Sequence, residues 1–374
     1  MDSVLGDNLH TVSFPSKQIG LRAFMITLIL VATVIALIVP KRMPKRMTEI
    51  LWSVDGPSSI QSIVRSGDSL IVAGGKSYDC LDASTGRLRW RIASDGAFLA
   101  RPRVGENRLY AATSEGAVTC RSLADGRELW RARVLGSVYA DQLALTRSLC
   151  VASSDGAITA FNATTGVRSW SRDDLAYQDA RLESSPDGLL VATGQSVVLL
   201  SEEGDGVWQR PLNGVRAIAC GWNRTVCICT REKIMGLSLR AGAPEWEIAA
   251  DGPMFCFALR GEFLLVGYSW PGFGLNKEMS PPPSRCWLRL DANTGNRLWS
   301  SDVELENMRT TRDGWIIADD RGGEWRILDV TSGHVATSGR GVLDARSYVA
   351  PVVEGDRAWL EQAGRVVCLR VHRD

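Results

Sequence analysis

The segment Asp82-Ala-Ser-Thr-Gly86-Arg-Leu-Arg-Trp90 decides the fold, because its Gly-x-x-x-Trp core returns along the chain. The further copies are Gly126-Arg-Glu-Leu-Trp130, Gly166-Val-Arg-Ser-Trp170, Gly204-Asp-Gly-Val-Trp208, Gly242-Ala-Pro-Glu-Trp246 and Gly295-Asn-Arg-Leu-Trp299. Successive tryptophans of this set are 40, 40, 38, 38 and 53 residues apart. A nearly constant period of this length is the signature of a repeat protein in which each repeat forms one structural unit.

The interior of each repeat follows one pattern of turns and short apolar runs. In the second repeat, turn residues occupy 105–107, 114–116 and 125–126, and the runs between them cover 108–112, 117–121 and 128–130. Short runs with turn chemistry at 8–12-residue spacing indicate an antiparallel β-meander. Four strands in roughly 40 residues correspond to one blade of a β-propeller.

The number of repeats and the way the ring closes follow from counting turns. Eight first turns occur, near Gly67, Glu106, Arg147, Asp187, Asn223, Gly261, Asp313 and Gly355. The last unit stops at Val371 after its third strand, whereas residues 50–54 precede the first unit and carry an additional Trp52. We therefore expect an all-β, eight-bladed propeller of four-stranded antiparallel blades over residues 50–371. Its N-terminal strand would complete the last blade and remove free sheet edges.

The repeat tryptophans are expected to be structural. One indole per blade, burying about 150–250 Å², can pack between neighbouring blades, whereas a ligand cage needs several rings at one point. The expected docking residues are Trp52, Trp90, Trp130, Trp170, Trp208, Trp246 and Trp299, and Thr337 stands where the seventh unit lacks its tryptophan. Cys80, Cys120 and Cys368 share one third-strand position; equivalent positions of different blades lie too far apart for disulfides, so we interpret them as small core residues.

A membrane segment precedes the repeats. Residues 23–40 are free of charged side chains and are long enough, as a helix, to cross a hydrocarbon core of about 30 Å. The segment ends at Pro40 and continues into Lys41-Arg42 without a small-residue cleavage site, so we expect an anchor rather than a cleaved signal peptide. The expected organisation is a tail at 1–22, a transmembrane helix at 23–40, a basic linker at 41–49 and the propeller at 50–371.

The charges that flank the span indicate the side of the membrane on which the propeller lies. Two basic residues precede the span and four follow it at 41, 42, 45 and 46, so the positive-inside rule favours a cytoplasmic propeller on a single-pass anchor. An odd number of cysteines, nine, with no tight pairing framework agrees weakly with that side.

The form Asp-x-x-Thr/Ser-Gly-x-x-x-Trp, as at Asp82–Trp90 and Asp291–Trp299, resembles the repeat of pyrroloquinoline-quinone-type propellers. The resemblance spans residues 50–371 and implies eight blades. Its members include quinoprotein alcohol dehydrogenases, the propeller lipoprotein of the outer-membrane barrel-assembly machinery and anchored proteins without known activity, often outside the cytoplasm. The dehydrogenases are longer and use a vicinal cysteine pair and a Ca²⁺ site. This chain has no adjacent cysteines, so no catalytic, cofactor-binding or metal-binding residue is carried over.

Composition excludes several classes of function. A balance of 43 Lys+Arg against 42 Asp+Glu, without a dense basic block in the repeats, argues against nucleic-acid binding. Only three histidines are present, so a His-rich metal centre or a Ser-His-Asp site is not expected, although His334 alone could still serve as a base. Ala73-Gly-Gly-Lys-Ser77 resembles part of a phosphate-binding loop, but Leu70 replaces the first glycine and no helix is predicted after it. We interpret it as a turn.

The long 53-residue step contains an insertion at 269–285. In a meander this insertion extends from the end of the ring that also carries the connections between blades. It holds Trp270, Phe273, Lys277 and Pro282 within an aromatic and polyproline-containing stretch, which is typical of partner-binding surfaces. A variable loop folded onto its own blade is the alternative.

These observations lead to one functional hypothesis and two alternatives. The leading hypothesis is a membrane-anchored, non-catalytic propeller that binds a protein partner on its loop face, as a scaffold or assembly factor, without a cofactor. The alternatives are a quinone-dependent oxidoreductase and a small-ligand sensor, both using the axial funnel. The sequence does not identify the partner, the ligand, the cellular process or the oligomeric state.

Overall fold

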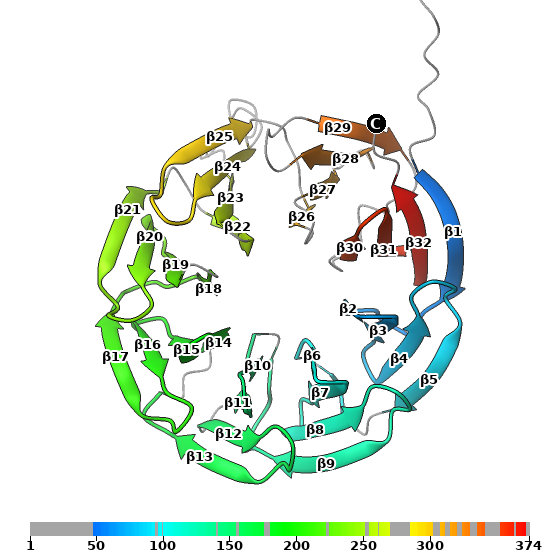
Figure 1. Ribbon diagram of the computed structural model, residues 1–374, viewed down its shortest axis with the longest axis horizontal. Helices are drawn as coiled ribbons and strands as arrows, with labels where there is room; N and C mark the ends of the chain where they lie inside the picture. Colours follow the sequence, from blue (N-terminus) through cyan, green and yellow to red (C-terminus); the bar gives the residue numbers. More distant parts are fainter. Residues whose placement is uncertain are drawn as a thin grey trace, which may run out of the picture. The chain divides into compact units, whose positions relative to one another are not determined.

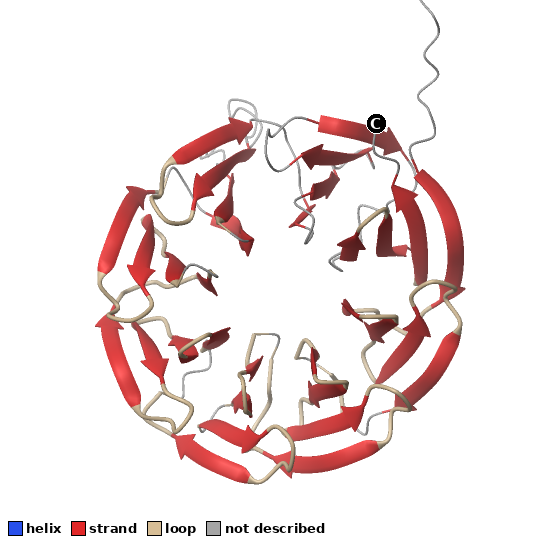
Figure 2. Ribbon diagram, in the orientation of Figure 1, coloured by secondary structure: helices blue, strands red, loops and turns tan. Residues whose placement is uncertain are grey.

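The computed structural model describes residues 48–93, 96–98, 100–139, 141–154, 157–175, 180–221, 224–250, 254–260, 262–269, 285–301, 307–310, 315–319, 324–329, 335–340, 352–362 and 364–371. Within these ranges the regular structure is entirely β-strand (Figure 2). The chain divides into two units between Arg46 and Met47, and every strand belongs to the second unit.

The described strands form four-stranded antiparallel sheets in which neighbouring strands are consecutive in sequence, except that the N-terminal strand joins the sheet of the last three strands. The first four sheets are β2 (Ser62–Ser66), β3 (Ser69–Ala73), β4 (Ser77–Asp82) and β5 (Leu88–Ala93); β6 (Arg103–Gly105), β7 (Arg108–Ala112), β8 (Ala117–Ser122) and β9 (Glu128–Arg133); β10 (Leu143–Leu145), β11 (Leu149–Ser153), β12 (Ile158–Asn162) and β13 (Arg168–Arg172); and β14 (Arg181–Ser185), β15 (Gly188–Ala192), β16 (Ser196–Leu200) and β17 (Gly206–Pro211).

The remaining sheets complete the unit. The fifth to seventh are β18 (Ala217–Cys220), β19 (Thr225–Cys229), β20 (Lys233–Ser238) and β21 (Pro244–Ala249); β22 (Met254–Arg260), β23 (Phe263–Ser269), β24 (Arg285–Asp291) and β25 (Arg297–Ser301); and β26 (Asn307–Thr310), β27 (Trp315–Asp319), β28 (Glu324–Asp329) and β29 (Val335–Arg340). The eighth sheet joins β1 (Thr48–Asp55) to β32 (Arg365–Val371), β31 (Arg357–Gln362) and β30 (Val352–Glu354).

The N-terminal strand β1 completes the sheet of β30, β31 and β32, as the surplus segment around Trp52 predicts. β1 pairs antiparallel with β32 from Thr48 opposite Val371 to Asp55 opposite Arg365, with a bulge between Ile50 and Trp52. Arg365 also donates to Asp55 (2.7 Å) and to the Ser53 hydroxyl (2.9 Å). The two ends of the repeat region are therefore held in one sheet.

The sheets of the second unit are arranged radially, with β2, β6, β10, β14, β18, β22, β26 and β30 innermost (Figure 1). Along this inner circle, β2 contacts β6 and β30, and each of β6, β10, β14, β18 and β22 contacts the inner strand that follows it. This arrangement and the four-stranded meanders identify the fold as a β-propeller.

The core lies between neighbouring sheets. One cluster joins Tyr110, Cys120 and Trp130 of the second sheet to Cys150 and Phe161 of the third. Middle strands such as β3 and β15 are buried at every position, which explains why their sequences are continuous apolar runs rather than alternating ones. The outer strands alternate between exposed and buried positions because only one face packs on the next sheet.

Several expectations fall on residues beyond the described ranges. The predicted membrane span at 23–40, the insertion residues Trp270, Phe273, Lys277 and Pro282, and His334 all lie outside them. Among the residues that the structure does describe, no helix is long and apolar enough to cross a membrane.

Candidate functional site

The repeat tryptophans lie on the fourth strands and reach into the next sheet. Five of these indole Nε1 groups donate to a main-chain carbonyl in the turn after the next sheet's third strand: Trp90 to Leu123 (2.9 Å), Trp130 to Ala163 (3.0 Å), Trp170 to Glu202 (2.8 Å), Trp208 to Leu239 (2.7 Å) and Trp246 to Ala292 (2.9 Å). Trp299 is half-buried at the matching position of the sixth sheet. These bonds tie each sheet to its successor.

The glycine of the repeat motif is the surface on which the preceding indole lies. Gly166 has φ +73°, and a Cβ built on it would stand 2.7 Å from Cδ2 of Trp130. Gly126, Gly204, Gly242 and Gly295 meet Trp90, Trp170, Trp208 and Trp246 in the same way. Glycine is required there both for the left-handed backbone and for the close contact. Each Gly-x-x-x-Trp motif therefore takes part in two contacts between sheets. Its glycine contacts the tryptophan of the preceding sheet, and its tryptophan contacts the following sheet.

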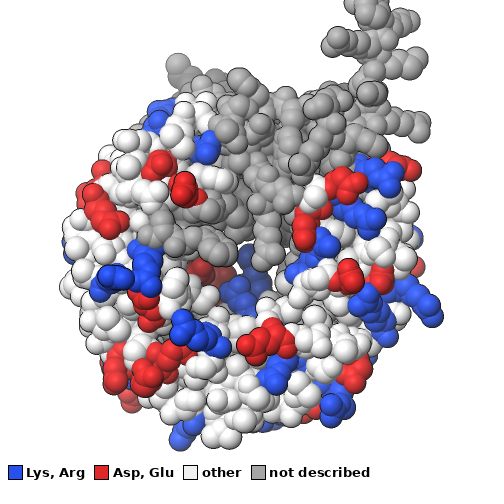
Figure 3. All heavy atoms as spheres, viewed as in Figure 1, with Lys and Arg blue, Asp and Glu red and all other residues white. Residues whose placement is uncertain are grey.

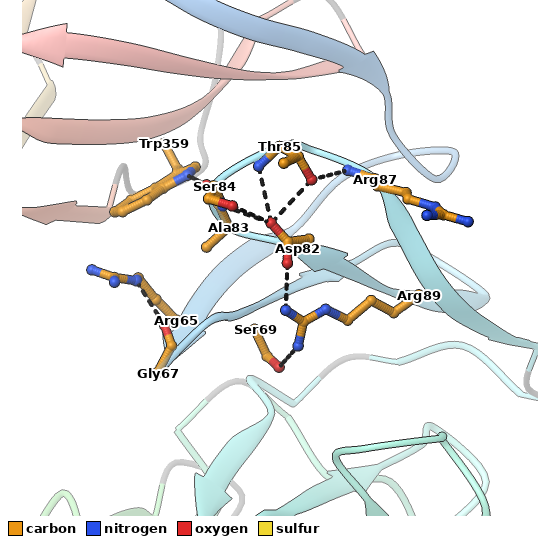
Figure 4. A network of polar contacts seen from close by, with 10 residues as sticks. All are labelled: Arg65, Gly67, Ser69, Asp82, Ala83, Ser84, Thr85, Arg87, Arg89 and Trp359. Carbon is orange, nitrogen blue, oxygen red and sulfur yellow. Dashed lines mark hydrogen bonds and ion pairs between the residues drawn. The ribbon is translucent and has the colours of Figure 1, made fainter.

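The turn that accepts the indole is built by its own side chains. In the first sheet, Asp82 Oδ1 accepts hydrogen bonds from the backbone N–H groups of Ser84 and Thr85, both at 3.0 Å, and from both hydroxyls (Figure 4). Arg89 donates to Oδ2 and to Ser69. The hydrogen bond from the Ser84 hydroxyl is the largest cause that lowers the pKa of Asp82 well below its ordinary value, and the bond from Arg89 is the second. Local side-chain chemistry thus shapes each joint.

The joint between the eighth and first sheets is different. Trp52 lies against Gly86, with Cε3 2.6 Å from the site of a Cβ, but its Nε1 is buried without a hydrogen-bond partner. The carbonyl of Ala83, which occupies the accepting position, instead receives Trp359 Nε1 at 2.9 Å (Figure 4). Trp359 belongs to β31, at the register position that Tyr110 occupies in the second sheet, where the Tyr110 hydroxyl donates to Ala163.

Seven cysteines are thiols outside any disulfide bond, and of these Cys220 is half-buried while the others are buried: Cys80, Cys120, Cys150, Cys227, Cys229 and Cys368. Cys80, Cys120 and Cys368 lie opposite Trp90, Trp130 and Trp52 in the strand pairing, where a small residue leaves room for the indole. Burial raises the pKa of Cys227 and Cys229 to about 12 and that of Cys368 to about 11, so these thiols stay protonated at neutral pH. Low-pKa nucleophilic cysteines have the opposite character.

The expected turn at Ala73–Ser77 packs on the chain that follows the closing strand. The Gly75 N–H donates to the Ser58 carbonyl (3.0 Å), and the Phe98 N–H donates to the Gly75 carbonyl (3.0 Å). A Cβ on Gly74 would meet Pro57 and Ser58 at 2.7 Å. Gly74 is therefore required by packing against a neighbouring connection, whereas a Cβ on Gly75 would meet no atom closer than 3.8 Å. In the described ranges, no group of three or more His, Cys, Asp or Glu residues is arranged to hold a metal ion.

One end of the ring is formed by the turns between second and third strands and by the connections between sheets. In the second sheet, the Ser114 N–H donates to the Ala97 carbonyl on one side (2.8 Å), and the Val134 N–H donates to the Gly116 carbonyl on the other (2.9 Å). The Ser137 hydroxyl also donates to the Ser114 carbonyl at 2.7 Å. These bonds hold the connection 134–139 in place on the loop end.

That connection presents large apolar side chains to solvent. Leu135 is 81% exposed and Tyr139 is 48% exposed, while Val138 between them is fully buried. Leu129, on the strand that leads into the connection, is 38% exposed. The sequence pattern indicates the insertion as the candidate surface and does not single out these residues. The alternation of apolar and basic residues from 129 to 135 is the signal that could have identified them.

The face seen in Figure 3 shows no large patch of one charge sign among the described residues. Lys and Arg alternate with Asp and Glu around the described rim, and basic atoms are visible in the central hollow. Many of the charges are paired within a sheet, including Arg91 with Asp79 and Lys233 with Glu247. The described part of this face is therefore mixed in charge, in line with the net charge of +1.

The fold and the repeated joints define a β-propeller built from pyrroloquinoline-quinone-like repeats. A family model described as outer membrane protein assembly factor BamB matches residues 45–119 and 80–267, which is more than half of the chain. The chain belongs to this family. No curated protein sequence matches it.

The solved structures that share the fold include BamB, an enzyme and a designed protein. BamB from Moraxella catarrhalis is 14% identical with a TM-score of 0.63, covering 86% of this chain and 97% of that one. A quinohemoprotein alcohol dehydrogenase from Pseudomonas putida is 11% identical with a TM-score of 0.63, covering 88% and 77%. The computationally designed protein Ika8 is 13% identical with a TM-score of 0.66, covering 86% and 100%. At these identities the likeness concerns the fold alone.

Proposed function

We propose that the protein is a membrane-anchored, non-catalytic propeller of eight blades that binds a partner protein as a scaffold or assembly factor. Membership of a family named for an assembly factor supports a protein-binding role. The observation that carries the proposal is the exposure of Leu135 and Tyr139 on a connection that hydrogen bonds hold in place. Exposed apolar side chains on an ordered loop are typical of interaction sites rather than of solvated surface.

Partner binding is tested by capture from the membranes in which the full chain is made. The double variant Leu135→Ser with Tyr139→Ser is expected to lose a partner that the unaltered chain retains after crosslinking. Val167→Ser is the matched control, because Val167 is also an exposed apolar residue, at 66%, but lies in the turn before β13. A chain that captures no partner, or equal capture by all three proteins, would contradict the proposal.

The insertion contributes a second, separate test. Deleting residues 270–284 is expected to leave the propeller folded and to weaken partner capture, because this stretch contains Trp270, Phe273, Lys277 and Pro282. Unchanged capture would remove the insertion from the binding surface without affecting Leu135 and Tyr139.

The anchor is the remaining part of the proposal. Residues 23–40 would hold the protein in the membrane after alkaline washing, and a chain lacking residues 1–46 would be released. The basic flank at 41–46 favours a cytoplasmic propeller. A reporter fused after Asp374 that is active only outside the cytoplasm decides the side, since its activity would refute this orientation.

A further inference from the structure

The outer edge of the second sheet carries an exposed stripe whose composition is unlike that of the other described outer strands. Along β9 and the residues after it, Leu129, Arg131, Arg133 and Leu135 are exposed, whereas the alternate residues 130, 132 and 134 are buried or half-buried. Because side chains alternate between the two faces of a strand, Leu129, Arg131 and Arg133 lie on one face of β9, and the exposed Leu135 follows two residues after the strand ends. The stripe therefore reads apolar, basic, basic, apolar.

The charge of this stripe is not neutralised locally. Glu128 accepts hydrogen bonds from Arg121 (2.7 Å) and from Arg131 (2.8 and 3.1 Å), so that two guanidinium groups share one carboxylate. Arg133 has no carboxylate partner in the part of the chain that the structure describes. Arg133 therefore adds a positive charge next to the exposed Leu135.

The matching positions of other sheets show that this positive charge is particular to the second sheet. In the first sheet, Arg91 stands where β9 has Arg131, but both of its donor groups bind the buried Asp79 at 2.7 Å. The same position holds Ser171 in the third sheet and Glu247, paired with Lys233, in the fifth.

The backbone edge beside the stripe is open to a further strand. β9 is the outermost strand of its sheet, so only one of its two edges is used by β8. Prolines stand at the ends of two other outer strands, Pro211 in β17 and Pro244 in β21, and proline at an edge discourages strand addition. β9 contains no proline.

We propose that β9 binds an extended acidic segment of the partner protein, which adds to the sheet as a fifth strand. Cross-strand neighbours interact most strongly when their charges are opposite or both are apolar. The bound segment would therefore place two acidic residues, two positions apart, beside Arg131 and Arg133. Apolar residues at both ends would pack on Leu129 and Leu135. Backbone hydrogen bonds supply affinity and the alternate side chains supply specificity. The inference rests on the proposed partner-binding function and names its site and ligand chemistry.

The stripe favours a peptide over a membrane surface or a second copy of the chain. It is one strand wide and combines a hydrogen-bonding edge with side chains at two-residue spacing, which suits a single extended segment. An acidic lipid surface has no use for the backbone edge. The acidic outer strand of the fifth sheet could mimic the ligand, but Glu247 already binds Lys233 at 2.9 Å.

The test uses the full chain in detergent and a fluorescent synthetic peptide in which valine and glutamate alternate. We expect saturable binding by fluorescence anisotropy, and loss of binding when lysine replaces glutamate or when a central proline is introduced. Arg133→Glu and Leu135→Ser should each weaken binding by about tenfold or more, which corresponds to about 1.4 kcal/mol. Ala93→Glu is the matched control, because Ala93 is exposed at the corresponding position of β5, and should bind as the unaltered chain does.

Several outcomes would overturn the inference. They are equal binding of the lysine peptide, full binding by Arg133→Glu, a doubled molecular mass of the peptide-free chain that Arg133→Glu abolishes, and binding of anionic vesicles in place of the peptide. Partner capture by the variants distinguishes failure of the β9 site from failure of the proposed partner-binding function. If capture persists in Arg133→Glu but is lost in the double variant Leu135→Ser with Tyr139→Ser, the β9 site is wrong while partner binding stands. If no form captures a partner, the proposed function itself fails.

Discussion

Trp359 Nε1 donates a 2.9 Å hydrogen bond to the carbonyl oxygen of Ala83, joining residues 276 positions apart in the sequence. Trp359 is 1% exposed, and the guanidinium carbon of Arg65 lies 4.6 Å from its ring centroid. Arg65 in turn pairs with Glu354 of the inner strand β30. The first and eighth sheets are thus sealed by residues of β31 and β30, in addition to the pairing of β1 with β32.

This arrangement predicts that two tryptophans of one sheet differ in energetic importance. Trp359→Phe leaves the Ala83 carbonyl without its donor, whereas Trp52→Phe removes an N–H that has no partner. Both changes remove a similar part of an indole. We expect Trp359→Phe to lower the free energy of unfolding by about 1 kcal/mol more than Trp52→Phe. Urea denaturation followed by fluorescence measures both, and the opposite order would show that the hydrogen bond to Ala83 is dispensable.

The contact between a glycine and the preceding indole predicts a graded effect of alanine. Gly166→Ala combines a left-handed backbone with a Cβ 2.7 Å from Trp130, whereas Gly67, at φ +54°, has no atom within 4 Å of its added Cβ. The backbone term alone costs roughly 1–2 kcal/mol, and crowding adds about 1–3 kcal/mol at Gly166 only. Equal losses of unfolding free energy in the two variants would mean that the indole moves aside freely.

The repeat, the four strands of each unit and closure by the N-terminal strand could be predicted because each depends on local chemistry. Turn residues and apolar runs recur at a fixed spacing, and the surplus segment around Trp52 has to pair somewhere. The role of Trp359 could not be predicted in this way, because its acceptor belongs to the opposite end of the chain. Its sequence context on β31 resembles that of any buried strand residue.

The candidate binding surface was harder to predict than the fold. The sequence directs attention to the insertion, where Trp270 and Phe273 break the repeat. The exposure of Leu135 depends on how the connection 134–139 is fixed to the turn at Ser114 and Gly116, which is a contact between separate segments. The alternation of apolar and basic residues from 129 to 135 indicates an edge strand, but it does not show that the apolar residue after that strand stays exposed.

The buried thiols predict a chemical protection pattern. Burial is the main cause that raises the pKa of Cys220, Cys227 and Cys229 to about 12, so native thiolate is scarce at neutral pH. Cys220 is only half-buried, and we expect it to react with a maleimide before the other described cysteines. Peptide mapping by mass spectrometry assigns each site. Rapid labelling of Cys150 in the folded protein would contradict the tight packing between the second and third sheets.

Acid stability provides a test of the turn at Asp82. The folded-state pKa of this carboxyl lies below its ordinary value of 3.8, chiefly through the Ser84 hydroxyl and then through Arg89. A depressed pKa contributes stability above the unfolded-state value, and this contribution is lost as the pH falls through the folded-state value. Asp82→Asn retains an oxygen that can cap Ser84 and Thr85, as Asn162 does for Thr164 and Thr165 in the third sheet.

The Asp82→Asn chain should therefore be less stable than the unaltered chain at neutral pH, and the difference should shrink as the pH is lowered below 3.8. Its size is modest because the carboxylate is close to solvent, where salt and water weaken ion pairs. Urea midpoints of both chains, measured at descending pH, give the comparison. Arg89→Gln should reproduce part of the neutral-pH loss, because it removes the charged donor to Oδ2 and leaves the Ser84 and Thr85 bonds intact. A stability difference that stays constant with pH would show that the Asp82 turn depends on shape and not on charge.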